Sequence, residues 1–93
     1  MRRKARVDAN HGDVIQALRS AGYVVIDASR VGGGFPDAIA MKHGRVVFVE
    51  IKNGAKVPSA RKLTADEAKW HETAARAGVI VQVITSVEDA IRL

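Results

Sequence analysis

The sequence predicts an α/β or α+β domain in which helices flank a mixed central sheet. Segments with helical spacing of apolar residues alternate with β-branched runs that are typical of strands. The predicted order is helix, strand, strand, strand, helix, strand and a short C-terminal helix. A helical segment leads directly into the apolar run 79–85, and this connection favours a strand parallel to its sheet neighbour. We assign residues 10–93 to one domain, because 93 residues suffice for a single core.

The first half of this domain begins with a helix over residues 10–21. Asn10 is a residue type favoured at the N-cap, and Gly22 is suited to ending the helix. The β-branched and aromatic run 23–27 predicts a short buried strand. Residues 31–36 contain three glycines and a proline, which predict a loop.

A tight β-hairpin is predicted next, with strands at 37–42 and 45–52 and the turn at His43-Gly44. Gly44 adopts positive φ without a Cβ clash, and two turn residues between apolar runs are typical of such a hairpin. With the turn centred there, the numbers of opposing residues sum to 87. The predicted pairs are Lys42 with Arg45, Met41 with Val46, Ile39 with Phe48, and Asp37 with Glu50.

This register brings Asp37, Glu50 and Lys52 together at one end of the hairpin and makes them candidate residues of a functional site. Opposed residues share a face of the sheet with Cβ atoms about 4.5–5.5 Å apart, and Lys52 shares that face because strand side chains alternate. Two adjacent carboxylates repel unless they share a proton or a cation, so the pair indicates a metal site. The competing interpretation is a turn residue at Asp37 and an exposed ion pair between Glu50 and Lys52. Glu50 argues against it, because it interrupts an apolar run and needs compensation if buried.

The second half contains a polar, basic connection over residues 53–62 and then a second helix over 64–77. Thr64 and Glu67 fit the capping-box pattern, which predicts the start of this helix. The apolar strand 79–85 follows. Ser86 with Asp89 predicts the cap of the short final helix.

Charge is concentrated at the N-terminus, where we expect residues 1–9 to form a flexible basic arm. The net charge is +5, from 15 basic and 10 acidic residues, and Arg2, Arg3, Lys4 and Arg6 supply much of it. A basic arm on a nearly neutral body suits a phosphate polymer. A solvated terminus explains the charge equally well.

The remaining bulk properties narrow the class of protein. The absence of cysteine excludes disulfides and Cys-ligated zinc and fits a reducing compartment. No apolar run approaches the roughly 20 residues that span a bilayer, and no signal-peptide stretch follows the basic start. We therefore expect a cytoplasmic protein that does not contact membranes.

Three motifs together carry a resemblance that covers essentially the whole chain after the arm. These are Gly-Gly-Gly-Phe-Pro-Asp (32–37), Val-Glu-Ile-Lys-Asn-Gly (49–54) and Pro-Ser-Ala-Arg-Lys-Leu-Thr (58–64). They resemble the small stand-alone VRR-NUC domains of phages and bacteria, within the PD-(D/E)XK nuclease superfamily. The resemblance implies a restriction-endonuclease-like αβββαβ core, and a protein of phage or of a bacterial host cell.

The resemblance also implies a Mg²⁺ or Mn²⁺ cofactor and roles for the motif residues. Asp37 and Glu50 would be metal ligands, with the Ile51 backbone carbonyl as a third oxygen. Lys52 would orient the attacking water or stabilise the transition state of phosphodiester hydrolysis. Hard divalent cations prefer such oxygen ligands. A lysine beside two carboxylates stays charged, which favours electrostatic help over a general-base role.

Two helical positions differ from the family pattern. Asp13 stands where the family commonly has Glu on the first helix, and it would reach the metal directly or through water. Glu67 stands where many relatives have Gln, and its capping role already explains it. His71 lies on the second helix, where partial burial accounts for it and a substrate or dimer contact is an alternative.

Further contacts with nucleic acid are expected from the loops. Gly33 and Gly34 would permit close approach of a nucleic-acid backbone beside Asp37. Lys56, Arg61 and Lys62 would grip phosphates, although a solvated basic loop explains them nearly as well.

The sequence therefore predicts a metal-dependent DNA endonuclease. Backbone or structure recognition is favoured over base readout, because so small a chain leaves almost no room for a reading module. The resemblance implies a homodimer acting on branched or duplex DNA, in the manner of a four-way-junction resolvase. The alternatives are a non-catalytic nucleic-acid-binding module derived from a nuclease fold, and a structural protein in which the motif residues form an ion-pair network.

Overall fold

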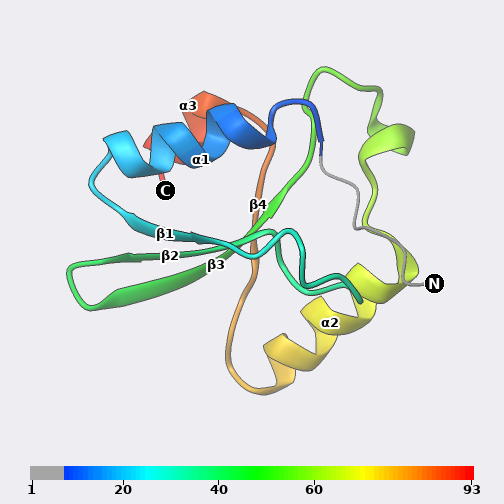
Figure 1. Cartoon of the computed structure of the whole chain (residues 1–93). Helices are drawn as coiled ribbons and strands as arrows, with labels where there is room; N and C mark the ends of the chain where they lie inside the picture. Colours follow the sequence, from blue (N-terminus) through cyan, green and yellow to red (C-terminus); the bar gives the residue numbers. More distant parts are fainter. Residues whose placement is uncertain (1–7) are drawn as a thin grey trace.

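The computed structural model describes residues 8–93 and shows a four-stranded sheet with helices on both faces (Figure 1). The strands lie in the order β1-β2-β3-β4; β1, β2 and β3 pair antiparallel, and β4 runs parallel to β3. This confirms the predicted mixed sheet. The elements are α1 (His11–Ser20), β1 (Val24–Asp27), β2 (Ala38–Lys42), β3 (Arg45–Ile51), a 3₁₀ turn (Pro58–Arg61), α2 (Ala65–Arg76), β4 (Gln82–Ile84) and α3 (Val87–Ile91).

The β2–β3 hairpin has the predicted register. His43 and Gly44 have φ values of 50° and 76°, so both turn residues adopt the left-handed conformation of a type I′ turn. Lys42 pairs with Arg45, and the ladder continues to Ala38 opposite Val49. The next positions along the two strands are Asp37 and Glu50. The turn at His43-Gly44 therefore determines which residues lie opposite each other at the far end of the hairpin.

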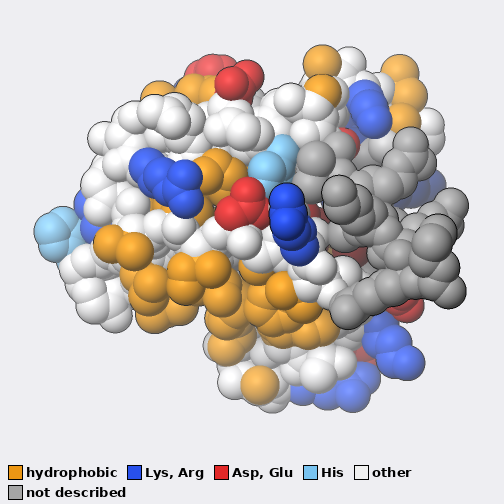
Figure 2. Space-filling model, in the orientation of Figure 1, with side chains coloured by type: hydrophobic (Ala, Val, Ile, Leu, Met, Phe, Trp, Pro, Cys, Tyr) orange, Lys and Arg blue, Asp and Glu red, His pale blue; other side chains and the backbone are white. Residues whose placement is uncertain are grey.

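β1 is an edge strand and is more exposed than the sequence predicts. Val24 and Ile26 retain 64% and 51% of their accessible surface. Only one face of this edge is covered, so the alternate side chains remain open to solvent. Figure 2 shows apolar side chains gathered along the lower side of the molecule in that view, between the strands and α2. The prediction of a buried strand was wrong for these two residues.

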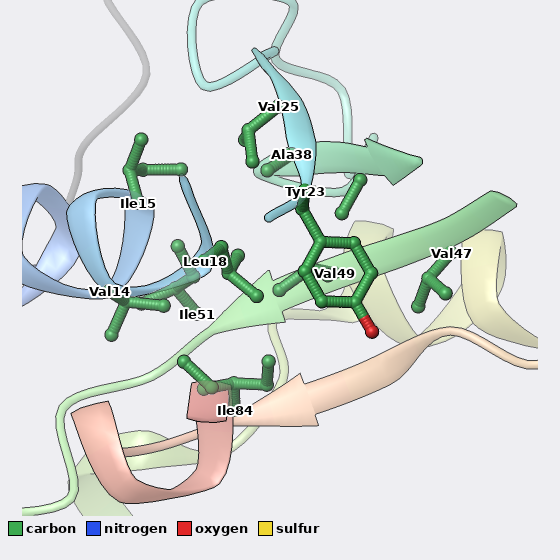
Figure 3. Close-up of a cluster of buried hydrophobic side chains, with 12 residues drawn as sticks. Val14, Ile15, Leu18, Tyr23, Val25, Ala38, Val47, Val49, Ile51 and Ile84 are labelled. Carbon is green, nitrogen blue, oxygen red and sulfur yellow. The ribbon is translucent and has the colours of Figure 1, made fainter. Parts of the chain in front are cut away.

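The main core lies between the sheet and the α1–α3 layer (Figure 3). Val14 and Leu18 of α1 are fully buried there, against strand residues that alternate along β3. Phe48, between two of these residues, points to the opposite face, where it contacts Trp70 of α2. The sheet thus has an apolar core on one face and α2 on the other. The core residues are Val14, Ile15, Leu18, Tyr23, Val25, Ala38, Ala40, Val47, Val49, Ile51, Ile84 and Ala90.

The predicted helix caps are partly confirmed. Thr64 and Glu67 form a complete capping box at α2, and the Ser86 side chain accepts a hydrogen bond from the Asp89 backbone N–H at α3. Asn10 occupies the N-cap position of α1, but its side chain makes no capping hydrogen bond. Its Nδ2 instead donates to the carbonyl oxygens of Lys52 and Thr85, at 3.1 and 3.3 Å. Asn10 therefore ties α1 to the ends of β3 and β4.

Two further expectations concern the ends of elements. The strand predicted over 79–85 is regular only over the three residues of β4. Asp8 and Ala9, expected in the arm, form the turn that leads into α1, and the backbone N–H of His11 donates to the Asp8 carbonyl. Arg2, Arg3, Lys4 and Arg6 lie outside the described residues. Within residues 8–93, no helix has the length and apolar character needed to cross a membrane.

Candidate active site

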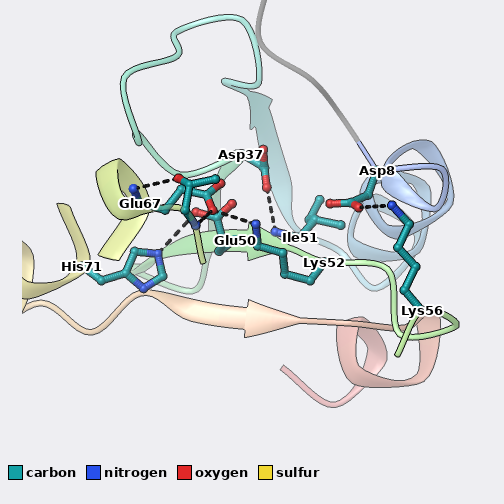
Figure 4. Close-up of polar contacts among 9 residues, drawn as sticks. Asp8, Asp37, Glu50, Ile51, Lys52, Lys56, Glu67 and His71 are labelled. Carbon is teal, nitrogen blue, oxygen red and sulfur yellow. Dashed lines mark hydrogen bonds and ion pairs between the residues drawn. The ribbon is translucent and has the colours of Figure 1, made fainter. Parts of the chain in front are cut away.

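Asp37, Glu50 and Lys52 meet where β2 begins and β3 ends (Figure 4). The Asp37 Oδ2 atom accepts a hydrogen bond from the Ile51 backbone N–H at 2.7 Å, which fixes this carboxylate against β3. Glu50 and Lys52 lie on the face covered by α2, and only 1% and 8% of their surfaces are exposed. The structure therefore brings together the three residues that the sequence singled out.

Glu50 is a buried carboxyl group with an incomplete set of partners. Its Oε1 atom lies 3.3 Å from Nε2 of His71. Its Oε2 atom is buried and, among the described residues, has no hydrogen-bond partner. Burial, and then the neighbouring Asp37 carboxyl group, raises the pKa of Glu50 to about 10. Without a cation, the site strongly disfavours a second negative charge.

Lys52 is held by a carboxylate from α2. Its Nζ donates to Oε1 of Glu67 at 2.7 Å. Burial opposes a charged ammonium, but the hydrogen bond and negative charge of Glu67 outweigh it and raise the pKa of Lys52. The same pair lowers the pKa of Glu67 in spite of its burial. Lys52 is therefore a charged group at neutral pH.

Glu67 has two roles, of which sequence reasoning identified one. Its Oε1 also accepts a hydrogen bond from the Thr64 backbone N–H at 2.8 Å, which completes the capping box. His71 follows one helical turn later and reaches Glu50. Burial lowers the pKa of His71, which favours the neutral imidazole. The i, i+4 spacing of Glu67 and His71 was the available sequence signal, since such residues share a helix face.

Aromatic packing and a glycine set the position of α2. The Trp70 ring lies 5.2 Å from that of Phe35 and 5.8 Å from that of Phe48, measured between centroids. Gly34, with φ of 86°, packs against the first turn of α2, where an added Cβ would lie 2.3 Å from the Asp66 carbonyl oxygen. The loop before β2 and the helix that supports the site are therefore packed together.

Gly33 and Gly34, the two loop glycines predicted to approach nucleic acid, have different surroundings. At Gly34, the α2 backbone occupies the place that a Cβ would take. Gly33, with φ of 64°, faces open space. Gly34 therefore has a packing role as well, and the predicted contacts of Gly33 and Gly34 with nucleic acid stay predictions.

Asp13 does not join the carboxylates. It is exposed on α1 and lines a hollow that also includes Ser20, Val87 and Ile91, on the α1–α3 side of the sheet. α1 directs Val14 and Leu18 into the core, and Asp13 therefore points elsewhere. Asp8, just before α1, is instead the N-terminal acid that acts on the site, because its negative charge helps to raise the pKa of Lys52. The Asp8 carboxylate also lies 3.8 Å from the Lys56 ammonium group.

The basic residues after β3 lie in the connection to α2. Lys56 and Lys62 are exposed, and Arg61 ends the 3₁₀ turn. Their surface positions fit the predicted contact with phosphates, which stays a prediction. The role of the Ile51 carbonyl as a metal ligand is likewise a prediction.

The donor set fits a hard divalent cation with incomplete protein ligation. Within residues 8–93, no three His, Asp or Glu side chains converge closely enough to hold an ion by themselves. The Asp37 and Glu50 carboxylates supply oxygen ligands, and the unpartnered Glu50 Oε2 is a buried acceptor suited to a cation. Backbone carbonyl oxygen and water would complete the coordination, as Mg²⁺ commonly requires.

Comparison with known proteins identifies the fold. No protein-family model matches the chain, and no curated protein matches it. Among solved structures, a chain described as "VRR_NUC domain" is similar over 92% of this chain and 95% of its own length. The TM-score is 0.67 and the sequence identity is 24%. This likeness confirms the predicted nuclease-like fold.

Proposed function

We propose that this chain, which has the fold of a VRR_NUC domain, is a Mg²⁺- or Mn²⁺-dependent DNA endonuclease. The observation that carries the proposal is the placement of Glu50 beside Asp37 and Lys52, with one buried carboxylate oxygen that has no partner among the described residues. The raised pKa of Glu50 indicates that the two carboxyl groups share a proton when no cation is bound, and a divalent cation would take the place of that proton.

Each residue has a distinct role in the proposed hydrolysis. Asp37, Glu50 and the Ile51 carbonyl hold the cation, which when bound polarises the phosphate and lowers the pKa of bound water. Lys52 remains protonated because Glu67 is its partner. The ammonium group therefore stabilises negative charge that develops on the phosphate, rather than accepting a proton from water. Glu67 orients this ammonium group.

The proposed substrate is branched DNA, such as a four-way junction. Residues 8–93 form one four-stranded sheet with its flanking helices, and among them no separate base-reading element is present. Lys56, Arg61 and Lys62 would contact phosphates on the side of the molecule that carries the end of β3. Contacts of this kind recognise the shape of the backbone and not the base sequence.

We further propose a homodimer, because a symmetric pair supplies one active site for each of two strands. Support comes from an apolar row on the α2 face of the sheet, in which Val24 pairs with Met41 and Met41 with Val46. Val24 and Val46 are both more than half exposed. This row is free of charged side chains and suits a protein surface better than DNA. Light scattering should give about twice the chain mass of 10.0 kDa.

The catalytic proposal is tested by cleavage of duplex, single-stranded, flapped and four-way-junction DNA in Mg²⁺ or Mn²⁺. The wild type should cleave the junction fastest and should be inactive in EDTA. Asp37→Asn, Glu50→Gln and Lys52→Ala should each reduce cleavage by at least about 100-fold, while DNA binding is retained. Lys69→Gln, on the exposed side of α2, serves as the control.

Two outcomes would overturn this function. Binding without cleavage on every substrate and with either metal would favour a non-catalytic nucleic-acid-binding module. Cleavage at the wild-type rate by Glu50→Gln would remove the proposed site from the mechanism.

A further inference from the structure

We propose that His71 is a positioning residue that orients the Glu50 carboxylate toward the metal, an inference that rests on the proposed function. His71 lies on α2 and Glu50 on β3, and the two side chains meet at 3.3 Å between Nε2 and Oε1. Both are largely enclosed, since 16% of the His71 side chain and 1% of the Glu50 side chain are exposed. The contact links the helix to the sheet inside the candidate site (Figure 4).

The chemistry of this contact suits a supporting group. An imidazole that donates its Nε2–H satisfies one oxygen of a carboxylate without neutralising its charge. Oε1 is then held in place, and Oε2, which has no partner among the described residues, stays available to a cation. Hydrogen-bonding partners of metal-ligating carboxylates act in this way, because they fix the orientation of the ligand.

The position of His71 is itself set by packing. Its neighbour Trp70 contacts Phe35 and Phe48, and this contact seats α2 on the sheet. Glu67, one turn earlier, binds Lys52 through the same helix face. One side of α2 therefore contacts two residues at the end of β3: His71 contacts the Glu50 carboxyl group, and Glu67 binds the Lys52 ammonium group.

The other two histidines have different surroundings. His11 lies 3.0 Å from the Asp27 carboxylate, at the start of α1. His43 occupies the hairpin turn and is exposed. His43→Gln is therefore a matched control for substitutions at His71.

Calorimetric titration of the full chain with Mn²⁺, in the absence of DNA, tests the inference. His71→Ala and His71→Phe should weaken Mn²⁺ binding by about 10–100-fold, whereas His71→Gln, whose amide also donates, should stay within about threefold of wild type. His43→Gln should bind as the wild type does. A denaturation curve for each metal-free variant establishes that it is folded. If His71→Ala does not fold, His71→Gln and His71→Phe are compared with the wild type instead.

The outcomes separate this inference from the proposed function. Absence of Mn²⁺ binding by the wild type would overturn both. Wild-type binding that persists in His71→Ala, or that is restored by Phe, would overturn only the positioning role, since Phe fills space without donating. Pulsed electron paramagnetic resonance of the Mn²⁺ complex should show no histidine nitrogen coupling to the metal. A coupling that disappears in His71→Gln would make His71 a direct ligand and contradict the inference.

Discussion

Lys52 on β3 and Glu67 on α2 form a largely buried ion pair, with 2.7 Å between Nζ and Oε1. The same Glu67 oxygen accepts a hydrogen bond from the Thr64 backbone N–H and caps α2. One carboxylate thus joins the start of a helix to the proposed catalytic lysine. The stability of the helix and the geometry of the site depend on the same side chain.

We therefore expect Glu67→Ala to lower the free energy of unfolding by about 1–3 kcal/mol, because it removes a cap contact and leaves the Lys52 charge without this partner. Glu67→Gln should cost clearly less, since Gln also serves at this position of a capping box and still accepts from Lys52. Urea denaturation measures both values, with Asp66→Ala in the same helical turn as the control. Equal losses in the Ala and Gln variants would contradict this account.

Glu50→Gln should make the metal-free protein more stable at pH 8 while abolishing metal binding. Folding raises the pKa of Glu50 from 4.5 to about 10, so between these pH values the folded state binds a proton that the unfolded state has released, and this destabilises the folded state increasingly as pH rises. The neutral amide removes this cost, and a gain of about 0.5–2 kcal/mol is expected. Thermal denaturation with and without Mg²⁺ checks the prediction. Added Mg²⁺ should stabilise only the wild type, and equal stabilisation of both proteins would contradict it.

Gly34→Ala should be more destabilising than Gly33→Ala. Both residues have positive φ, which costs about 1 kcal/mol or more for a residue with a Cβ. At Gly34 the added atom would also collide with the α2 backbone at Asp66, so a total loss of about 2–4 kcal/mol is expected. Gly33 faces open space and serves as the matched control. Similar losses at both positions, measured in urea, would show that the close packing is unimportant.

Asp27 should contribute a pH dependence to stability below pH 4. Although burial opposes it, hydrogen bonds from Ser29 and His11 lower the pKa of Asp27 from 3.8 to about 2. Because folding lowers the pKa of Asp27, its carboxylate stabilises the folded state fully above pH 3.8, and this stabilisation is lost as the pH falls toward 2. Unfolding free energies at pH 6, 4, 3 and 2 should therefore decline less steeply in Asp27→Asn than in the wild type. An identical decline would assign the acid sensitivity to other carboxyl groups.

Local signals allowed much of the fold to be predicted from the sequence. The hairpin register followed from two turn residues, because regular strand pairing continues from His43-Gly44 to Ala38 and Val49, the neighbours of Asp37 and Glu50. The cap of α2 followed from Thr64 and Glu67. The exposure of β1 could not be predicted from the sequence, because a β-branched run is typical of both edge strands and buried strands.

The sequence by itself therefore determined the three motif residues and the strand pairing that brings them together. Only the tertiary structure decided which helical residues join them: Glu67 and His71 reach the site and Asp13 does not. The physical reason is that helix orientation depends on packing between distant segments, here Trp70 against Phe35 and Phe48 on one face, and Val14 and Leu18 in the core on the other. Hairpin pairing is local, whereas the docking of a helix on a sheet is decided by the side chains of both.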